Sequence, residues 1–515
     1  MKLPILCLLA VAAGGAGGVL TPPHRSYRIL MLLPIASISH RNVFMPLATA
    51  LADRGHQVVM LTSNQELVDY PNIQEIYHGI PIESMFNRSL FEDRNDPIGI
   101  FLLLGEILLT VVKRIYQVPV VKDLYHRRKE FDLVIINQRY NEIVYPFLHE
   151  IPFITLSTRD MDLCQSAILG NVLNPAYFVK LYSNYFDRAR GRLTLLVQRL
   201  RLDFYWRYWQ VIPKLQKEIS AQFPGLPPLL ELERNVSLVL ANTHFSMGPV
   251  LPLLPSQVDV GGMHCRPGHS LPRELDSWIS GAGSAGVVYF SLGSVFKTDT
   301  LPDQYVGLFV EVFRRLPQRV IWKYDGRLEG LSDNVLVRKW LPQQDILAQD
   351  SVKAFITHGG LLSLQEAVYH AKPVLVLPLF SDQPRNAKFV WDKGLGLTLS
   401  WNDALTPDKV VGALTDVITN PKYKENVTKI SHSLRDQMLT PRELAVFWTE
   451  YVLRHPGVPH LRNPAAHLSW LEFLMLDVLL VVLLALLVFC FILRSILRTI
   501  LGQLVSLGAG KIKTE

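Results

Sequence analysis

The sequence predicts an α/β protein with two doubly wound domains and one membrane-spanning helix close to the C-terminus. Two series of continuous apolar runs alternate with helical patterns, and such runs are typical of parallel sheets buried on both faces. A segment rich in proline and glycine, 253–272, separates the two series, and the run 478–493 contains no charge. With 515 residues, 49% of them hydrophobic, the chain is long enough for two or three domains with proper cores.

The first 18 residues are typical of a secretory signal peptide. Lys2 precedes a short apolar run, and a stretch of alanine and glycine follows that run. A buried first strand would not be expected to contain so many small residues. We therefore assign 1–18 to a signal peptide and expect cleavage within 13–18.

The first domain is expected over 25–260. Its first strand, YRILMLLP, ends at Pro34, and the helix that follows, about 42–54, has apolar residues at the i, i+3, i+4, i+7 spacing of an amphipathic helix. Further strands are predicted at 56–62 and 131–136.

The second domain is expected over 261–440. The strands VVYFSL, VIWKY, KAFIT, PVLVLPL and GLTLS alternate in most places with helical patterns, such as those over 301–316 and 407–419. Each domain therefore has the alternation that builds a doubly wound, Rossmann-like sheet.

Two segments, 87–128 and 166–223, depart from this alternation. The second is rich in aromatic residues and arginine, and the net charge of the chain is +7. Such a segment could bind nucleic acid, but the signal peptide directs the chain away from it, so we predict no nucleic-acid partner. Two interpretations stay open: a membrane-surface segment lining the access route of a lipophilic substrate, or an ordinary helical excursion. The apolar run 98–112 is predicted to be a packed helix.

The segment 471–493 is predicted to span a membrane, with Asp477 near the lumenal interface. A span needs roughly 20 mostly apolar residues, and this run is apolar all round, unlike an amphipathic helix. The tail 494–515 carries more basic than acidic residues, which places it in the cytosol. Its last five residues, KIKTE, resemble a dilysine retrieval signal of the endoplasmic reticulum. We therefore expect a single-pass type I protein of that membrane, with its body in the lumen.

Glycosylation sequons begin at Asn87, Asn235 and Asn426. Four cysteines are too few for a disulfide scaffold, and whether Cys164 pairs with Cys265 stays open. The sequence shows no clustered pattern of metal ligands, so no metal is predicted.

The stretch THGGLLSLQE, 357–366, joins the strand KAFIT to the next helix. Ligands of open α/β sheets bind at the carboxyl ends of strands, where the turn around Gly360 lets the backbone approach a phosphate. The helix that follows presents free N–H groups at its N-terminus, and His358 adds another donor. Glu366, one or two turns into that helix, is placed to accept two ribose hydroxyls.

The next strand ends in FSDQ, which supplies Asp382 and Gln383. An acid next to an amide suits the hydroxyls of a sugar. The ligand that these residues imply is a diphosphate with a ribose on one side and a sugar on the other.

The whole stretch FITHGGLLSLQEAVYHAKPVLVLPLFSDQ resembles the signature of the UDP-glycosyltransferases, the membrane-bound glucuronosyl- and glucosyltransferases of animals. The motifs FSLGS, WLPQQDIL and AVFWTEYVLRHPG extend the resemblance over nearly the whole chain. The resemblance implies the two-domain GT-B architecture, a donor site in the second domain, and a segment 441–470 that returns toward the first domain. The UDP-sugar is then a co-substrate, and no cofactor is implied.

The resemblance also implies roles for residues outside the opening turn. Trp340 would stack on the uracil with Gln343 beside it, and Ser294 would join His358 at the diphosphate. Trp340 could instead be a core aromatic residue, but the motif WLPQ favours the uracil contact. The roles of Glu366 and of the acid–amide pair agree with those derived above.

Two departures from the family pattern bear on the donor. Leu362 stands where vertebrate members have asparagine, which resembles arthropod members. Leu251 falls where a family arginine is thought to favour glucuronate, so the sequence places no cation there for a carboxylate. We therefore favour UDP-glucose over UDP-glucuronate.

The reaction needs a base to take the proton of the acceptor hydroxyl. His40, just after the first strand, is the histidine that the family uses, and an acid should orient its ring. The family aspartate is replaced here by Asn137, which can orient a ring but cannot balance its charge. Glu142 is the favoured substitute, and Asp160 and Asp162 are alternatives; the motif DMD that holds Asp162 formally resembles a metal motif of another fold.

Two functions are therefore considered. The first is an inverting hexosyltransferase that acts on a hydroxyl of a small lipophile such as a phenol, steroid or xenobiotic. The second is a weakened or inactive protein that still binds a UDP-sugar or a lipophile, an alternative that only Asn137 supports. The sequence does not identify the acceptor, and whether the protein forms a homo-oligomer stays open.

Overall fold

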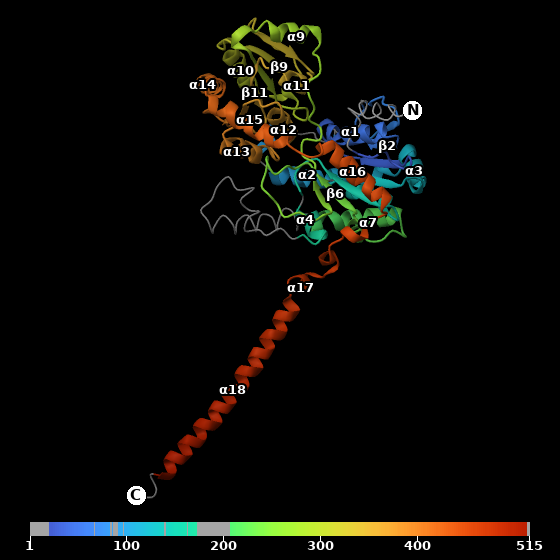
Figure 1. Ribbon diagram of the computed structural model, residues 1–515, viewed down its shortest axis with the longest axis vertical. Helices are drawn as coiled ribbons and strands as arrows, with labels where there is room; N and C mark the ends of the chain where they lie inside the picture. Colours follow the sequence, from blue (N-terminus) through green and yellow to red (C-terminus); the bar gives the residue numbers. More distant parts are fainter. Residues whose placement is uncertain are drawn as a thin grey trace, which may run out of the picture.

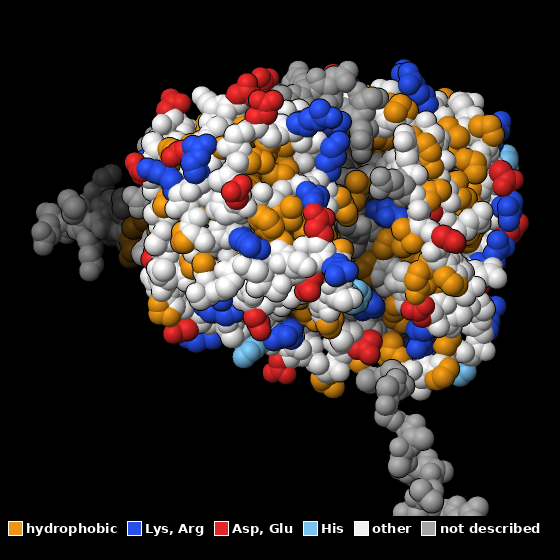
Figure 2. All heavy atoms as spheres, turned by 90° about the horizontal axis from the view of Figure 1, so that it is seen from above, with side chains coloured by type: hydrophobic (Ala, Val, Ile, Leu, Met, Phe, Trp, Pro, Cys, Tyr) orange, Lys and Arg blue, Asp and Glu red, His pale blue; other side chains and the backbone are white. Residues whose placement is uncertain are grey.

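The computed structural model describes residues 20–65, 67–82, 85, 91–95, 97–138, 141–161, 163–171 and 207–511. The predicted signal peptide, the sequon at Asn87, Asp162, most of the second insert and the last four residues lie outside these ranges. The described chain forms two lobes, and a long helix leads away from the lower lobe to the C-terminus (Figure 1). Seen from above, the surface is hollowed where the lobes meet, and basic and acidic side chains are interspersed around it (Figure 2).

The first lobe is built on a seven-stranded sheet in which every neighbouring pair is parallel, in the order β3-β2-β1-β4-β5-β6-β7. Three of its strands were predicted, and the structure adds the other four. The strands are β1 (Arg28–Leu33), β2 (Gln57–Thr62), β3 (Ile73–Tyr77), β4 (Leu133–Asn137), β5 (Phe153–Ser157), β6 (Leu238–Ala241) and β7 (Gln257–Asp259).

Both faces of this sheet are covered, because successive side chains of a strand point to opposite sides. Leu30 and Leu32 of β1 lie in one core with α2 and α7, while Ile29 and Met31 lie in the other with α1 and α16. The predicted packed helix is confirmed as α2. The helices of this lobe are α1 (Ile38–Asp53), α2 (Pro97–Ile115), α3 (Pro119–His126), α4 (Leu163–Ile168), α7 (Ile212–Gln222), α8 (Leu229–Arg234) and α16 (Pro441–Arg454).

Helix α16 follows the second domain in sequence but lies against α1 of the first lobe (Figure 1). Its Glu450 receives two hydrogen bonds from Arg54, at 2.5 and 3.0 Å, and lies 3.2 Å from Nε2 of the buried His56. Burial opposes ionisation of Glu450, but these partners outweigh it and lower the pKa of the carboxyl to about 2. The helix is thus fixed to the first lobe by charge as well as by apolar packing.

The second lobe contains a six-stranded parallel sheet in the order β10-β9-β8-β11-β12-β13. Its strands are β8 (Val287–Ser291), β9 (Arg319–Lys323), β10 (Val335–Arg338), β11 (Val352–Thr357), β12 (Val374–Val376) and β13 (Gly396–Thr398). Its helices are α9 (Arg273–Ser280), α10 (Asp303–Arg314), α11 (Gln343–Leu347), α12 (Leu361–Tyr369), α13 (Gln383–Lys393), α14 (Pro407–Thr419) and α15 (Pro421–Arg435).

Each sheet reverses its strand order at one place. In the first sheet the chain runs outward from β1 to β3 and returns beside β1 as β4; in the second it runs from β8 to β10 and returns beside β8 as β11. Open α/β sheets bind ligands at the carboxyl ends of the strands that flank such a switch point. The fold therefore predicts ligand sites at the turns after β1, β4, β8 and β11.

The C-terminal helix is longer than the predicted span of 471–493. After the short α17 (Trp470–Phe473), Met475 has a left-handed φ of 52°, and α18 (Leu476–Lys511) begins at the next residue. By length and composition, 29 residues of α18, Leu476–Leu504, could cross a membrane, and none of its most apolar part is buried against the rest of the chain. At 1.5 Å per residue they measure about 43 Å, more than a hydrocarbon core of about 30 Å.

The two sequons within the described chain differ in their surroundings. Asn235, which ends α8, is exposed. Asn426 on α15 is partly buried, and its amide nitrogen donates to the carbonyl oxygen of Gly394 at 3.2 Å. Cys265 carries a free thiol, 3.8 Å from Nε2 of its neighbour His264, so it forms no disulfide with Cys164.

Candidate active site

The predicted base lies at the switch point of the first sheet. His40 is in the first turn of α1, and the backbone N–H of His40 donates to the hydroxyl of the helix cap, Ser37, at 3.4 Å. Asn137 ends β4, the strand that pairs with β1, and its neighbour Ile136 is aligned with Leu32. The two residues thus follow adjacent parallel strands at the same edge of the sheet.

Asn137 is almost completely buried, with 2% of its surface exposed. Neither its side-chain nitrogen nor its side-chain oxygen has a hydrogen bond within the described part of the chain. Its backbone oxygen accepts a hydrogen bond from the side chain of Asn141. A buried amide in this state costs free energy, which is typical of a site that a ligand or a water completes.

Two of the three acids considered as partners of His40 have other partners in the structure. Glu142 is buried and accepts a hydrogen bond from Arg207 at 3.1 Å; Arg207 also donates to Glu233 at 2.6 Å. Asp160 forms an ion pair with Arg385. The structure therefore places two of the three acids beside arginines, and the acid that would serve His40 stays a prediction.

The turn after β11 packs closely against the turn after β8. A Cβ atom added to Gly293 would lie 2.7 Å from Cε1 of His358, and one added to Gly360 would lie 2.5 Å from Nε2 of the same ring. Gly293 also has a φ of +86°, which favours glycine. Both glycines therefore leave the space that the imidazole of His358 occupies, and Ser294 follows directly after the first of them.

Burial lowers the pKa of His358 to about 4, although the nearby charge of Asp382 partly opposes this shift. The ring is therefore neutral near pH 7, with one N–H to donate. It lies three residues before the first residue of α12, Leu361, and two residues before the N-cap, Gly360. A neutral donor beside free backbone N–H groups suits an anionic ligand such as a diphosphate.

Glu366 and Gln343 meet at the side of this turn. The Gln343 amide donates to Glu366 at 2.5 Å and to the hydroxyl of Ser363 at 3.0 Å, and its oxygen lies 3.3 Å from the hydroxyl of Tyr289. Burial raises the pKa of Glu366 to about 7, although Gln343 and a nearby arginine favour the charged form. Two of the residues predicted to hold the uridine, Gln343 and Glu366, are thus brought together.

His264, which no sequence motif indicated, also lies beside Glu366. Nε2 of His264 lies 3.6 Å from Glu366 and 3.2 Å from the carbonyl oxygen of Leu362. Burial lowers the pKa of His264 to about 4, so the ring is neutral near pH 7 and forms no ion pair with the carboxyl. No short motif marks this residue, because 102 positions separate it from Glu366.

We expect UDP binding to weaken as the pH falls through 7. If Glu366 holds the ribose as a carboxylate, lowering the pH from 8 to 6 reduces its ionised fraction about tenfold, and the dissociation constant for UDP should rise by about the same factor. Titration calorimetry of the wild type and of Glu366→Gln separates this effect from titration of the phosphate. A wild-type profile parallel to that of Glu366→Gln would contradict the assignment.

Trp340 is not a core aromatic residue. It lies between β10 and α11, and 62% of its surface is exposed. Gln343, three residues later, begins α11. An exposed indole in this place can stack on a planar base without disturbing a core.

The acid–amide pair lies at the start of α13. One carboxylate oxygen of Asp382 accepts a hydrogen bond at 2.8 Å from Asn386, which also donates to the carbonyl oxygen of Gly359 at 2.9 Å. Gln383 uses its side-chain oxygen to accept from the backbone N–H groups of Leu379 and Phe380, at 2.7 and 3.1 Å. Asn386 thus joins the turn predicted to hold the sugar to the turn predicted to hold the diphosphate, a role that spacing alone did not reveal.

A cation lies near one residue predicted to hold the sugar, although the sequence places none at position 251. Leu251, which falls where the family has an arginine, packs against the core of the first lobe. Arg159, on the loop after β5, reaches the other lobe and places Nη1 3.6 Å from the carboxylate of Asp382. The sequence analysis missed this residue because its partner lies more than 200 positions away.

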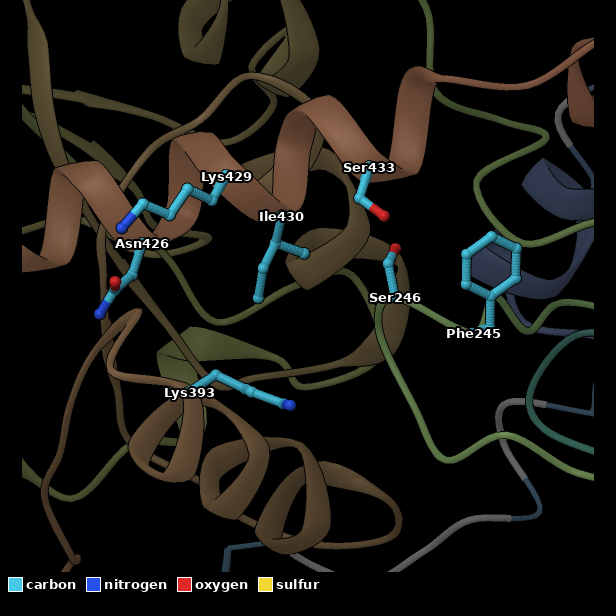
Figure 3. A pocket seen from close by; sticks show the side chains of 7 residues that line it. All are labelled: Phe245, Ser246, Lys393, Asn426, Lys429, Ile430 and Ser433. Carbon is cyan, nitrogen blue, oxygen red and sulfur yellow. The ribbon is translucent and has the colours of Figure 1, made fainter.

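A surface hollow of about 390 Å³ lies away from these residues, where helices of the second lobe meet a loop of the first (Figure 3). It is formed by the end of α13, one face of α15, and Phe245 and Ser246 from the segment between β6 and β7. No residue predicted for the site lines it. The predicted site is instead a set of turns that meet between the lobes.

Two parallel-sheet lobes with these switch points, and with a glycine–histidine turn at one of them, define a GT-B glycosyltransferase. A family model described as UDP-glucoronosyl and UDP-glucosyl transferase matches residues 123–510, and the chain belongs to this family. It is 33% identical over 482 residues to UDP-glycosyltransferase UGT5 of Dactylopius coccus, with 88% of each chain covered.

Two further comparisons agree with this assignment. The chain is 33% identical over 491 residues to UDP-glucosyltransferase 2 of Dactylopius coccus, with 93% of this chain and 92% of the relative covered. Its fold matches the crystal structure of the calicheamicin glycosyltransferase CalG4 with a TM-score of 0.56 at 17% identity, over 84% of this chain and 100% of the other. The protein is therefore an enzyme of the glycosyltransferase class.

Proposed function

We propose that the protein transfers a hexose from a UDP-sugar to a hydroxyl of a small lipophilic acceptor, with inversion at the anomeric carbon. The observation that carries the proposal is the cluster at the switch point of the second sheet. There the neutral His358 lies between Gly293 and Gly360, and Glu366 is bonded to Gln343. No resident cofactor or metal forms part of the proposal.

The proposed reaction is a direct displacement. The acceptor oxygen forms a bond to the anomeric carbon, the bond from that carbon to the β-phosphate oxygen breaks, and His40 takes the acceptor proton. Attack from the side opposite the leaving group inverts the configuration. Negative charge that develops on UDP is stabilised by the N-terminus of α12, by His358 and by Ser294.

Glucose is the favoured sugar and glucuronate is the alternative. The name of one Dactylopius relative, a UDP-glucosyltransferase, supports glucose. The absence of a cation, on which the sequence argument relied, no longer supports it, because Arg159 lies near Asp382. We propose residence in the endoplasmic-reticulum membrane with a lumenal body, on the basis of the apolar helix α18 and the lysines of the tail.

The test is an assay of microsomes that contain the full-length protein. UDP-glucose, UDP-glucuronate and UDP-galactose are offered separately with a mixed panel of phenols and steroids, and products are detected by mass spectrometry. A hexoside formed with at least one donor supports the proposal. Microsomes that bind UDP but form no product with any donor would favour the second candidate, a binding protein without transferase activity.

Asn137 is the feature that favours the second candidate. We expect Asn137→Asp to raise kcat, by about tenfold, because a carboxylate would orient His40 and offset its positive charge, and two nearby acids are held by arginines. The measurement is kcat with the best donor and acceptor. An unchanged kcat would show that another acid already serves His40.

A further inference from the structure

Two ion pairs cross the cleft between the lobes in opposite senses. Arg159 of the first lobe faces Asp382 of the second, and Arg385 of the second faces Asp160 of the first. The first lobe contributes both residues from the loop after β5, and the second contributes both from the start of α13. Each side thus contributes one acidic and one basic residue, and the two ion pairs fix how the loop after β5 meets the start of α13.

The first of these pairs includes a residue predicted to hold the donor sugar. Asp382 is fixed within its own lobe, because Asn386 donates to one of its oxygens at 2.8 Å. Arg159 approaches the other oxygen to 3.6 Å and also donates to the hydroxyl of Ser381 at 2.5 Å. Burial opposes ionisation of Asp382, but Arg159 and Arg385 outweigh it and lower the pKa of the carboxyl below its usual value.

The backbone conformation of Ser381 also favours the position of Arg159 beside Asp382. Ser381 has a left-handed φ of 65°, which is uncommon for a residue other than glycine. Such a conformation persists only where the surroundings determine it, and here it holds the serine hydroxyl toward Arg159. The side chains of Arg159 and Asp382 remain 25% and 15% exposed, so a ligand in the cleft can reach both.

We propose that Arg159, supplied by the first lobe, is a specificity-determining residue of the donor-sugar site and allows the site to accept a sugar that carries a carboxylate, the alternative donor, as well as glucose. This inference rests on the proposed function, since it takes Asp382 as the residue that holds the sugar. A uronic acid brings a negative charge close to the carboxylate of Asp382, and the two repel each other unless a cation lies between them. The guanidinium of Arg159 is placed to bind the sugar carboxylate with charge-assisted hydrogen bonds.

A neutral hexose carries no charge that repels Asp382, so it needs no cation beside that carboxylate. Its hydroxyls can donate to Asp382 whether or not Arg159 is present. Loss of the guanidinium should therefore weaken the binding of UDP-glucuronate more than that of UDP-glucose, and it should leave UDP itself unaffected.

The test measures binding, so that it does not depend on an acceptor. Labelled UDP is displaced from the full-length wild type and from Arg159→Gln by UDP, UDP-glucose and UDP-glucuronate. We expect the affinity ratio of UDP-glucuronate to UDP-glucose to fall about tenfold in Arg159→Gln, with the affinity for UDP unchanged. Arg159→Lys keeps a positive charge and should retain most of the ratio.

Arg385→Gln is the matched control, because it removes the other arginine of the crossed pairs while Arg159 stays in place. We expect it to change the affinities for both sugars alike. An equal fall of the ratio in both variants, or an unchanged ratio in Arg159→Gln, would overturn the inference and leave the proposed function standing. A wild type that binds no UDP would instead overturn the proposed function.

Discussion

Replacing His40 with alanine is expected to lower kcat by about 10²–10⁴-fold, because general base catalysis by a positioned side chain contributes about that much. UDP affinity should not change, because His358, Gln343 and Glu366, the residues predicted to bind UDP, lie in the other lobe. The measurements are kcat in the microsomal assay and UDP displacement on the same preparation. The backbone of His40 is bonded to Ser37, and a hydrogen bond of this kind survives the substitution.

His126→Ala serves as the control for this prediction. His126 is exposed in the last turn of α3, in the same lobe, and we expect its removal to leave kcat within about twofold of the wild type. If His40→Ala keeps more than about a tenth of the wild-type kcat, His40 is not the base.

Gly293→Ala should weaken UDP binding, because Gly293 packs against the ring of His358. The added Cβ atom would lie 2.7 Å from the ring of His358, and alanine at a φ of +86° costs roughly 1–2 kcal/mol. The ring must move away from the diphosphate, and loss of a hydrogen bond to a charged group costs about 1.5–3 kcal/mol. We therefore expect UDP affinity to fall roughly 10–100-fold, measured by calorimetry, and the thermal midpoint to decrease.

Gly307→Ala is the matched control. Gly307 lies within α10, nothing lies within 4 Å of an added Cβ atom, and alanine there should stabilise the helix by about 0.5–1 kcal/mol without affecting UDP. If Gly293→Ala binds UDP as tightly as the wild type, the ring of His358 does not contribute to the diphosphate site.

The sequence by itself determined the fold class, and it grouped the residues of one predicted donor turn. The apolar runs that became β1, β2 and β4, and those that became β8, β9, β11, β12 and β13, are local patterns. Each is readable because a parallel strand is buried on both faces. The structure adds β10 at the edge of the second sheet. The residues of the stretch 357–366 share one strand, one turn and one helix, so their spacing alone placed them at a carboxyl edge.

The sequence pattern did not predict elements whose position or length depends on packing. The edge strand β3 has two polar residues among its five, and β7 has only three residues, so the sequence gives them little periodicity to detect. Arg494 and Arg498 indicate the end of the apolar run, but they do not end the helix. Arginine is a good helix former, and α18 continues through both.

Only the tertiary structure decided which charges meet. Arg207 donates a hydrogen bond to Glu142, which lies 65 positions away in the sequence. Arg159 donates one to Ser381, which lies 222 positions away. Ion pairs of this kind depend on how loops and lobes are placed in space, and no periodicity along the chain records that placement. The sequence therefore predicted a donor site and a base, while the fold showed that Arg159 lies beside Asp382 and that Glu142 and Asp160 are already paired with arginines.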